Sequence, residues 1–249
     1  MALPASAGVD VYIGSGMNSR YAGYVAPAQY GFKNTIIEGT INKKPVMETV
    51  TINLPRNEQL SHIEIVVEDD DHVEAANPYT IPSPIVFYGS SITEGGCADR
   101  PGTAYTSIVS RWLDAESFNY GFSGSAKGES VVAEFIAAHP TIRAFVYDYD
   151  HNAPTSEHLE QTHKPFFEVI RKAHPSIPIL LLTRPDFDRN PEDSNRRRAI
   201  INDTYLTAIR NGDRNVYFID GQSSFWFDGT GGMHNRRMSP EQPWFYENG

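Results

Sequence analysis

The sequence predicts an α/β protein: a parallel sheet with helices on both faces, preceded by a smaller β-rich region. From Pro84 onward, short apolar runs alternate with segments whose apolar residues recur at helical spacing. This alternation is typical of a parallel sheet, because a crossover helix joins each pair of parallel strands. Between Gly8 and Glu68 the apolar residues alternate instead, with glycine and proline between the runs. We therefore expect a partial β-rich domain at 1–80 and an α/β domain at 81–249.

Three strands are expected in the first region, at Val9–Ile13, within Val46–Leu54 and at Ile63–Val67. Three strands are too few to close a sandwich. We therefore expect this region to be an incomplete, β-sandwich-like domain that continues beyond the sequence given. The acidic run at 68–71 is expected to be a solvated loop, because it lacks the ligand spacing of a known calcium loop.

The second region contains the elements of the predicted sheet. Strands are expected at Ile85–Tyr88, Ala144–Tyr149, Ile177–Leu182 and Val216–Ile219. Helices are expected over 103–113, 128–136, 159–170 and 200–209. The strand at Ile85–Tyr88 is the one around which the rest is arranged, since it leads directly into the turn Gly89-Ser90-Ser91.

The composition excludes several classes of partner. The 249 residues are 40% hydrophobic and carry a formal net charge of -10, which argues against nucleic acid and anionic membranes. The one basic run, 196–198, is expected on a solvated helix face. No apolar run approaches the ~20 residues that cross a bilayer, and no signal peptide is visible at the start of the sequence. The single cysteine, Cys97, allows no internal disulfide.

Polar turns follow three predicted strands, and together they suit a serine nucleophile. Ser91 is the candidate nucleophile, and its own N–H is a candidate oxyanion donor. Gly124 could present a second backbone N–H, and the Asn152 amide a third donor. Because the carboxyl ends of parallel strands meet at one edge, we expect these groups to converge there.

Each of these residues also has a structural interpretation. A Gly-Ser-Ser turn alone is more often a helix cap. Gly124 alone would be a conformational glycine, and Asn152 a turn residue. Three histidines (His151, His158 and His163) do not share one helix face, so surface and cap roles are favoured over a metal. The loop at 184–188 either lines the cleft or is structural.

These residues and their order resemble the SGNH, or GDSL-type, hydrolases. The resemblance implies a flavodoxin-like, three-layer α/β/α domain. It makes Ser91 the nucleophile and makes Gly124 and Asn152 members of the oxyanion hole. The match is closest to a branch with Tyr-Gly-Ser-Ser-Ile-Thr-x-Gly-Gly and an N-terminal Gly-x-Asp-Leu-Tyr signature, which 8–12 match with one change. Ester hydrolysis of small acyl groups is implied, including acetyl esters of carbohydrates, without metal or cofactor.

The end of the sequence departs from the family. The terminal Asp-x-x-His-Pro block, whose histidine is the base in this family, is absent, and the nearest candidates, Asp228 and His234, are six residues apart. One permitted codon choice for 233–245, read one base later, gives Cys-Ile-Thr-Asp-Gly-Cys-His-Pro-Asn-Asn-Leu-Gly. The hypothesis is that the atypical tail, 229–249, is out of frame. We therefore expect this chain to have little or no esterase activity.

Two other functions remain open. The protein could bind a carbohydrate or an ester at the same cleft without a working base. It could also be a flavodoxin-like phosphate- or nucleotide-binding protein, although it has no Gly-Lys-Ser/Thr loop.

Overall fold

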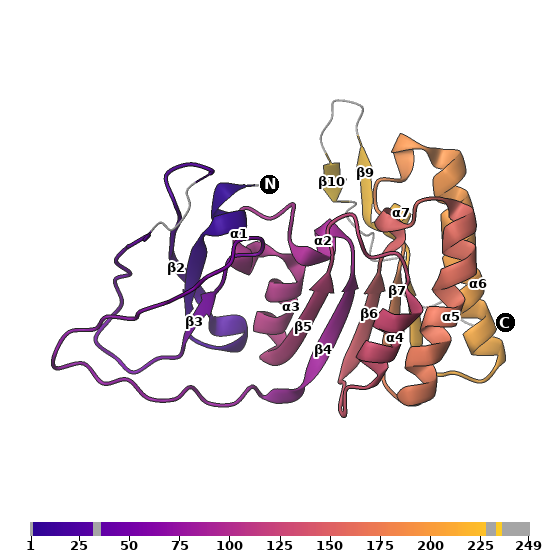
Figure 1. Ribbon diagram of the computed structural model, residues 1–249. Coiled ribbons are helices and arrows are strands. Elements are labelled where there is room, and N and C mark those ends of the chain that lie inside the picture. Colours follow the sequence, from indigo (N-terminus) through magenta and orange to yellow (C-terminus); the bar gives the residue numbers. More distant parts are fainter. Residues whose placement is uncertain (1, 32–35, 228–232, 236–249) are drawn as a thin grey trace. The chain divides into compact units, whose positions relative to one another are not determined.

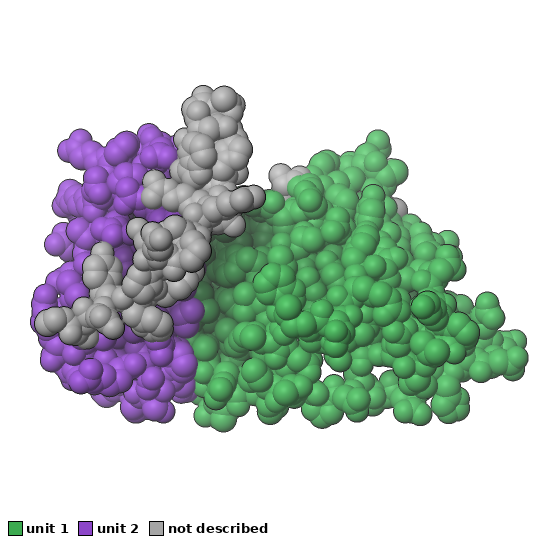
Figure 2. Space-filling view, turned by 180° about the vertical axis from the view of Figure 1, so that it is seen from behind, with its two compact units in different colours: residues 1–126, 139–152 green, residues 127–138, 153–249 purple. Residues whose placement is uncertain are grey.

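The computed structural model describes residues 2–31, 36–227 and 233–235, and for 224–227 and 233–235 the backbone alone. The chain forms two compact units (Figure 2), unit 1 from residues 1–126 and 139–152, and unit 2 from residues 127–138 and 153–249. The predicted division at residue 80 stays a prediction, because compactness alone does not define a domain.

Unit 1 begins with a small antiparallel sheet in the order β2-β1-β3. Its elements are α1 (Leu3–Ala7), β1 (Val9–Ile13), the 3-10 turn η1 (Gly16–Asn18), β2 (Arg20–Val25) and β3 (Val50–Asn53). Among the described residues, no further strand pairs with the outer edges of β2 and β3. β1 and β3 agree with the predicted strands, whereas β2 was not predicted.

The strand predicted at 63–67 is wrong, because these residues have no strand conformation. Val66 is 87% exposed and Ile65 68%, so two adjacent side chains, which a strand would point to opposite faces, are both largely exposed. Period-two alternation makes a strand only where a neighbour pairs with its backbone.

The α/β part contains a five-stranded sheet in the order β5-β4-β6-β7-β8, flanked by helices (Figure 1). In unit 1 its strands are β4 (Ile81–Gly89), β5 (Ala115–Gly121) and β6 (Ala144–Asp148). In unit 2 they are β7 (Ile179–Leu182) and β8 (Val216–Ile219). β4 is parallel to β5 and to β6, and β7 is parallel to β8. The predicted α/β class is confirmed.

The helices and turns follow the strands in the predicted rhythm. Unit 1 adds α2 (Ser91–Glu94), η2 (Pro101–Thr103), α3 (Tyr105–Leu113) and η3 (Asp150–Asn152). Unit 2 adds α4 (Ser130–Ala137), α5 (Ser156–Ala173), η4 (Phe187–Arg189), α6 (Pro191–Arg210), α7 (Gly221–Ser224) and an antiparallel pair, β9 (Phe225–Phe227) and β10 (Met233–Asn235). No described helix is long and apolar enough to cross a membrane.

β4 is the central strand of unit 1. Its residues Ile85–Tyr88 are all at least 95% buried, as the apolar run predicted. β4 runs between β5 and β6, so both of its backbone edges are hydrogen-bonded. This central position fixes the point at which Ser90 and Ser91 leave the sheet.

The basic run 196–198 lies on a solvated face only in part. The prediction is right for Arg196, which is exposed and pairs with Glu157, and wrong for Arg197. Arg197 is only 5% exposed, and its guanidinium donates to the Asp193 carboxylate at 2.7 Å and to the Ala153 carbonyl at 3.1 Å. Arg198 forms an ion pair with Asp220. The prediction failed because a charged side chain can be buried where carboxylates and carbonyls take all its donors.

Candidate active site

Two adjacent serines at the end of β4 have different surroundings. Ser90 is fully buried and is the N-cap of α2: its hydroxyl oxygen accepts a hydrogen bond from the Ile92 N–H at 3.2 Å. Ser91 is the first residue of α2 and is half-buried. Within the described part of the chain, neither its hydroxyl nor its N–H has a hydrogen-bond partner. The cap interpretation of the turn is therefore confirmed for Ser90, and the nucleophile interpretation of Ser91 stays a prediction.

Two glycines allow this turn to pack closely against the neighbouring strand ends. A Cβ on Gly89 would overlap the Thr93 hydroxyl and the Asp148 carbonyl. A Cβ on Gly121 would overlap the backbone of α2. The two strand-end glycines therefore act through their lack of a side chain, which places the start of α2 close to β5 and β6.

Hydrogen bonds join the three loops that carry the predicted site residues. The Phe122 N–H donates to the Gly89 carbonyl at 3.0 Å, and the Ser90 N–H donates to the Asp148 carbonyl at 3.3 Å. The Asn152 side-chain amide donates to the Phe122 carbonyl at 2.7 Å. In the registers Gly89 lies opposite Gly121 and Asp148, so all three loops leave the same edge of the sheet.

Two further groups at this edge can donate hydrogen bonds. Gly124 adopts a left-handed conformation, with φ of +67°, in a turn closed by the Ser125 N–H and the Phe122 carbonyl at 3.0 Å. Its own N–H has no acceptor among the described residues. The Asn152 amide carries two hydrogens, of which the bond to Phe122 uses one. That bond orients the amide and leaves the second hydrogen for a ligand.

A buried polar network lies beneath α2. The Asp148 carboxylate accepts hydrogen bonds from the Thr93 hydroxyl and from the Tyr105 hydroxyl, both at 3.0 Å. Burial raises the pKa of Asp148 to about 6, and its two hydroxyl donors oppose that rise. The Asn119 amide fixes α2 from another side, donating to the Thr93 carbonyl at 2.8 Å.

The sequence-based prediction missed this network. Thr93 lies inside the quoted nucleophile motif and Asp148 inside the third strand-end motif, but neither was assigned a role. Asp148 could have been found from the sequence, because a polar residue at the buried end of a strand must find a hydrogen-bond partner. Tyr105 had no comparable signal.

The structure does not describe the side chain of His234, the predicted base, or any part of Asp228, its predicted partner. His234 lies in β10, paired through its backbone with Trp226 in β9. Asp228 lies outside the described residues. In unit 1 the histidine nearest in sequence to the site is His151, half-buried in η3 next to Asn152.

The other histidines of the predicted group have structural contacts. His158 pairs through Nε2 with the Lys127 carbonyl at 2.7 Å. His163 is 1% exposed and is hydrogen-bonded through Nδ1 to the Thr204 hydroxyl at 2.9 Å. Burial lowers the pKa of His163 to about 3, so it is neutral at physiological pH. A surface role for His163 was therefore wrong, because it packs between α5 and α6.

The loop at 184–188 was left open between a cleft and a structural role. The Arg184 guanidinium donates to the Ser194 hydroxyl at 2.8 Å and to the Asp193 carboxylate at 3.1 Å. Both partners lie in the first turns of α6. These contacts favour the structural interpretation for Arg184.

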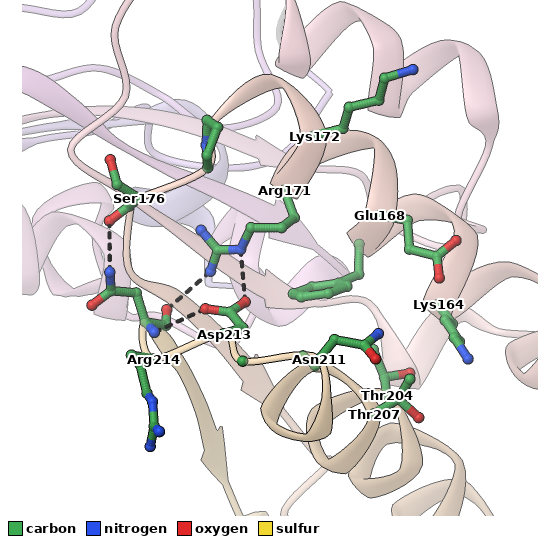
Figure 3. A pocket seen from close by; sticks show the side chains of 15 residues that line it. Lys164, Glu168, Arg171, Lys172, Ser176, Thr204, Thr207, Asn211, Asp213 and Arg214 are labelled. Carbon is green, nitrogen blue, oxygen red and sulfur yellow. Dashed lines mark hydrogen bonds and ion pairs between the residues drawn. The ribbon is translucent and has the colours of Figure 1, made fainter.

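Ser91, Gly124 and Asn152 do not line either of two cavities in the described structure. One, of about 570 Å³, lies in unit 2 beside the C-terminal ends of α5 and α6 (Figure 3). In it Arg171 is held by Asp213 at 2.8 Å. The other, of about 400 Å³, lies in unit 1 and includes Glu94 of α2 and Gly121. Gly124 is exposed at the carboxyl edge of the sheet, whereas Ser91 and Asn152 are half-buried there.

The protein is therefore an α/β protein with Ser91 at the carboxyl edge of its parallel sheet. The Ser91 hydroxyl has no hydrogen-bond partner among the described residues, and three hydrogen-bond donors lie at the same edge. A family model described as GDSL-like lipase/acylhydrolase matches residues 82–238, more than half of the chain. The chain belongs to this GDSL-like lipase/acylhydrolase family. By that resemblance it is a carboxylic ester hydrolase, as predicted. A search of curated proteins gave no match.

Solved structures agree with this assignment. A protein from Bacteroides ovatus ATCC 8483 described as a GDSL-like lipase is similar with a TM-score of 0.73 and 27% identity, covering 92% of this chain and 68% of that one. The salicylyl-acyltransferase SsfX3 from a tetracycline biosynthetic pathway has a TM-score of 0.61 and 16% identity, covering 88% of this chain and 62% of that one. The second likeness shows the fold alone.

Proposed function

We propose that the protein is a serine esterase for small acyl esters, with Ser91 as nucleophile. The observation that supports the proposal is a Ser91 hydroxyl without a hydrogen-bond partner among the described residues, at the same sheet edge as three donors. These donors are the Ser91 N–H, the Gly124 N–H and the second hydrogen of the Asn152 amide. Acyl transfer needs this combination, because the serine oxygen attacks the carbonyl carbon at the place where the donors must stabilise the oxyanion.

The reaction would proceed in two steps. The Ser91 oxygen attacks the ester carbonyl carbon while its proton passes to an imidazole. The oxyanion is held by the three donors, and its collapse expels the alcohol, which takes the proton back. Water then hydrolyses the acyl-enzyme with the same imidazole as base. No metal or organic cofactor takes part in this scheme.

His234 is the proposed base and Asp228 its proposed partner, but neither stands in the spacing of the family's terminal block. We therefore propose that the tail is out of frame and that this chain has little activity. Nucleotide sequence tests this directly: a frame that stays intact past Gly231 with no shifted Asp-Gly-Cys-His-Pro block contradicts it.

The substrate class is proposed from the resemblance. Small acyl groups, including acetyl groups on carbohydrates, fit an open sheet edge better than long acyl chains, which need a deep apolar cavity. The N-terminal sheet is proposed to be part of the β domain of the branch with the Gly-x-Asp-Leu-Tyr signature.

The test is turnover of p-nitrophenyl acetate by the purified chain, by the same chain with the shifted tail restored, and by Ser91→Ala in both. We expect turnover that depends on Ser91 in the restored chain and little in the present one. A present chain that turns over robustly and loses activity in His234→Ala would show that His234 acts as base. If activity survives that change, His151→Ala is the next variant.

The second candidate is a protein that binds a carbohydrate or an ester without hydrolysing it, favoured by the absence of the family's terminal Asp-x-x-His-Pro block from the sequence. Binding of an acetylated sugar without turnover, in the restored chain as well, would support it over the esterase.

A further inference from the structure

The N-terminal motif Gly-Val-Asp-Val-Tyr has no part in the proposed reaction, yet its aspartate is fully buried. Asp10 lies in β1, and its two carboxylate oxygens accept hydrogen bonds from the Gly102 N–H at 3.1 and 3.0 Å. Arg100 also approaches this carboxylate, at 3.7 Å. A buried carboxylate is tolerated only where such donors meet it, so Asp10 and Gly102 depend on each other.

The same motif reaches Gly102 from its other side. Arg111 donates to the Gly102 carbonyl at 2.9 Å, and its guanidinium carbon lies 3.9 Å from the centre of the Tyr12 ring. A Cβ on Gly102 would lie 2.5 Å from Tyr12 and 2.8 Å from Asp10, so no larger residue fits. We call Asp10, Tyr12, Arg111 and Gly102 the Gly102 clamp.

The clamp is connected to the nucleophile helix through α3. Gly102 lies in η2, and only Thr103 and Ala104 separate it from Tyr105, the first residue of α3. The Tyr105 hydroxyl lies 3.0 Å from the Asp148 carboxylate and 3.3 Å from the Thr93 hydroxyl. Thr93 is fully buried in α2, two residues after Ser91. The position of Gly102 therefore sets the position of the hydroxyl that supports α2.

We propose that Asp10 is a positioning residue for the reaction: by fixing Gly102 it fixes Tyr105, which with Asp148 holds the helix that begins with Ser91. This inference rests on the proposed function for the role of Ser91. It makes the strand β1 a part of the catalytic architecture that acts through η2 and α3.

The test compares Asp10→Asn with Glu48→Gln. Both replace a carboxylate by an amide near the same small sheet, but Glu48 pairs with Arg20 at the exposed surface, away from the clamp. Hydrogen exchange is followed in peptides covering 89–96 and 100–105. Kinetic constants for p-nitrophenyl acetate are measured in whichever form of the chain shows turnover that depends on Ser91.

We expect Asp10→Asn to speed exchange about tenfold in both peptides and to lower kcat about tenfold, with KM within about twofold, since one charge-assisted hydrogen bond is lost. Glu48→Gln should change neither. Faster exchange at 100–105 alone, with 89–96 and kcat as in the wild type, would overturn the proposal.

A second variant keeps the test decisive if Asp10→Asn does not fold. Tyr105→Phe leaves the clamp intact and removes only the hydroxyl that reaches Asp148, so exchange should rise at 89–96 and stay unchanged at 100–105. Unchanged exchange at 89–96 would overturn the connection. If no form of the chain shows turnover dependent on Ser91, the proposed function fails while the exchange result still decides on the clamp.

Discussion

The two units use buried polar groups for different purposes. In unit 1, Asp10 and Asp148 accept hydrogen bonds from the loops and turns that surround Ser91. In unit 2, Arg171 and Arg197 join helices to carboxylates and to carbonyls at loop and strand ends. Under the proposed function, these bonds position the site in unit 1, whereas in unit 2 they hold structural elements together. Substitutions in unit 1 should change the chemistry first, and those in unit 2 the stability.

The largest effect on stability is expected from Arg171→Met in unit 2. Its guanidinium donates to the Asp213 carboxylate and to the carbonyls of His174, Ile177 and Asn215, and its side chain is only 15% exposed. Removing it leaves the buried Asp213 carboxylate without its charged partner, with only the Asn215 N–H among the described residues still donating to it, which costs about 3–5 kcal/mol. Urea unfolding measures the loss, and Arg20→Met, at an exposed pair, is the control. A lowered kcat in the folded variant would contradict the contrast between the units.

Asn152→Ala in unit 1 should act on kcat. Loss of one oxyanion donor lowers kcat by about 10²–10³, or about 2.7–4 kcal/mol in the barrier. Steady-state kinetics in the active form of the chain measure it, with Asn215→Ala as the matched change in unit 2, where the amide donates only to the Ser176 carbonyl. An unchanged kcat for Asn152→Ala removes this residue from the oxyanion hole.

The units should also respond to pH in opposite directions. Asp148 has a folded pKa of about 6, above the usual 3.8, so the folded state holds its proton longer and stability falls as pH rises from about 4 to 6. His163 has a folded pKa of about 3, below the usual 6.5, so its contribution is lost as pH falls from 6.5 towards 3. Each slope is about 1.4 kcal/mol per pH unit, so the two oppose each other between pH 4 and 6.

Single variants separate these slopes. Asp148→Asn should make stability rise more steeply from pH 4 to 6, because only His163 then titrates in that window. His163→Gln should make stability fall over the same range. Urea midpoints at half-unit pH steps measure both. Parallel profiles for the wild type and Asp148→Asn would show that Asp148 is already ionised at pH 4.

The smallest effect on stability is expected from removing a helix cap. Each unit has one such cap, so the two variants form a closely matched pair. The Ser90 hydroxyl caps α2 in unit 1, and the Thr155 hydroxyl caps α5 in unit 2, each accepting a bond at 3.2 Å. Each change to alanine should cost about 1 kcal/mol of stability. Only Ser90→Ala should also lower kcat, because Ser91 follows it directly. Equal kcat in the two variants would show that the cap does not position the nucleophile.

Much of the fold could be predicted from the sequence where the local pattern has one solution. β1 and β8 were predicted with their observed limits, and β4 was found from a run buried on both faces. The segment at 63–67 failed, because alternation does not reveal whether a neighbouring strand exists. β2 was missed, since its sequence Arg-Tyr-Ala-Gly-Tyr-Val carries no clear alternation.

The residues of the candidate site could be predicted from the sequence, but the residues that hold them in position could not. The order of the three strand-end motifs placed Ser91, Gly124 and Asn152 at one edge, and their catalytic roles remain a prediction. Which of two adjacent serines caps the helix depends on where the helix begins, and helix limits are poorly defined by sequence. The contacts of Tyr105 and Asp10 join residues that are distant in the sequence, so no local pattern reveals them.

The open edges of the small antiparallel sheet bear on how the protein behaves in the test tube. β2 and β3 each have one side on which no described strand pairs, and Tyr24 and Val50 on them are 51% and 45% exposed. Unpaired backbone groups beside apolar side chains are a template for a strand of another molecule. We therefore expect concentrated preparations to self-associate over time, and light scattering during storage would measure this association.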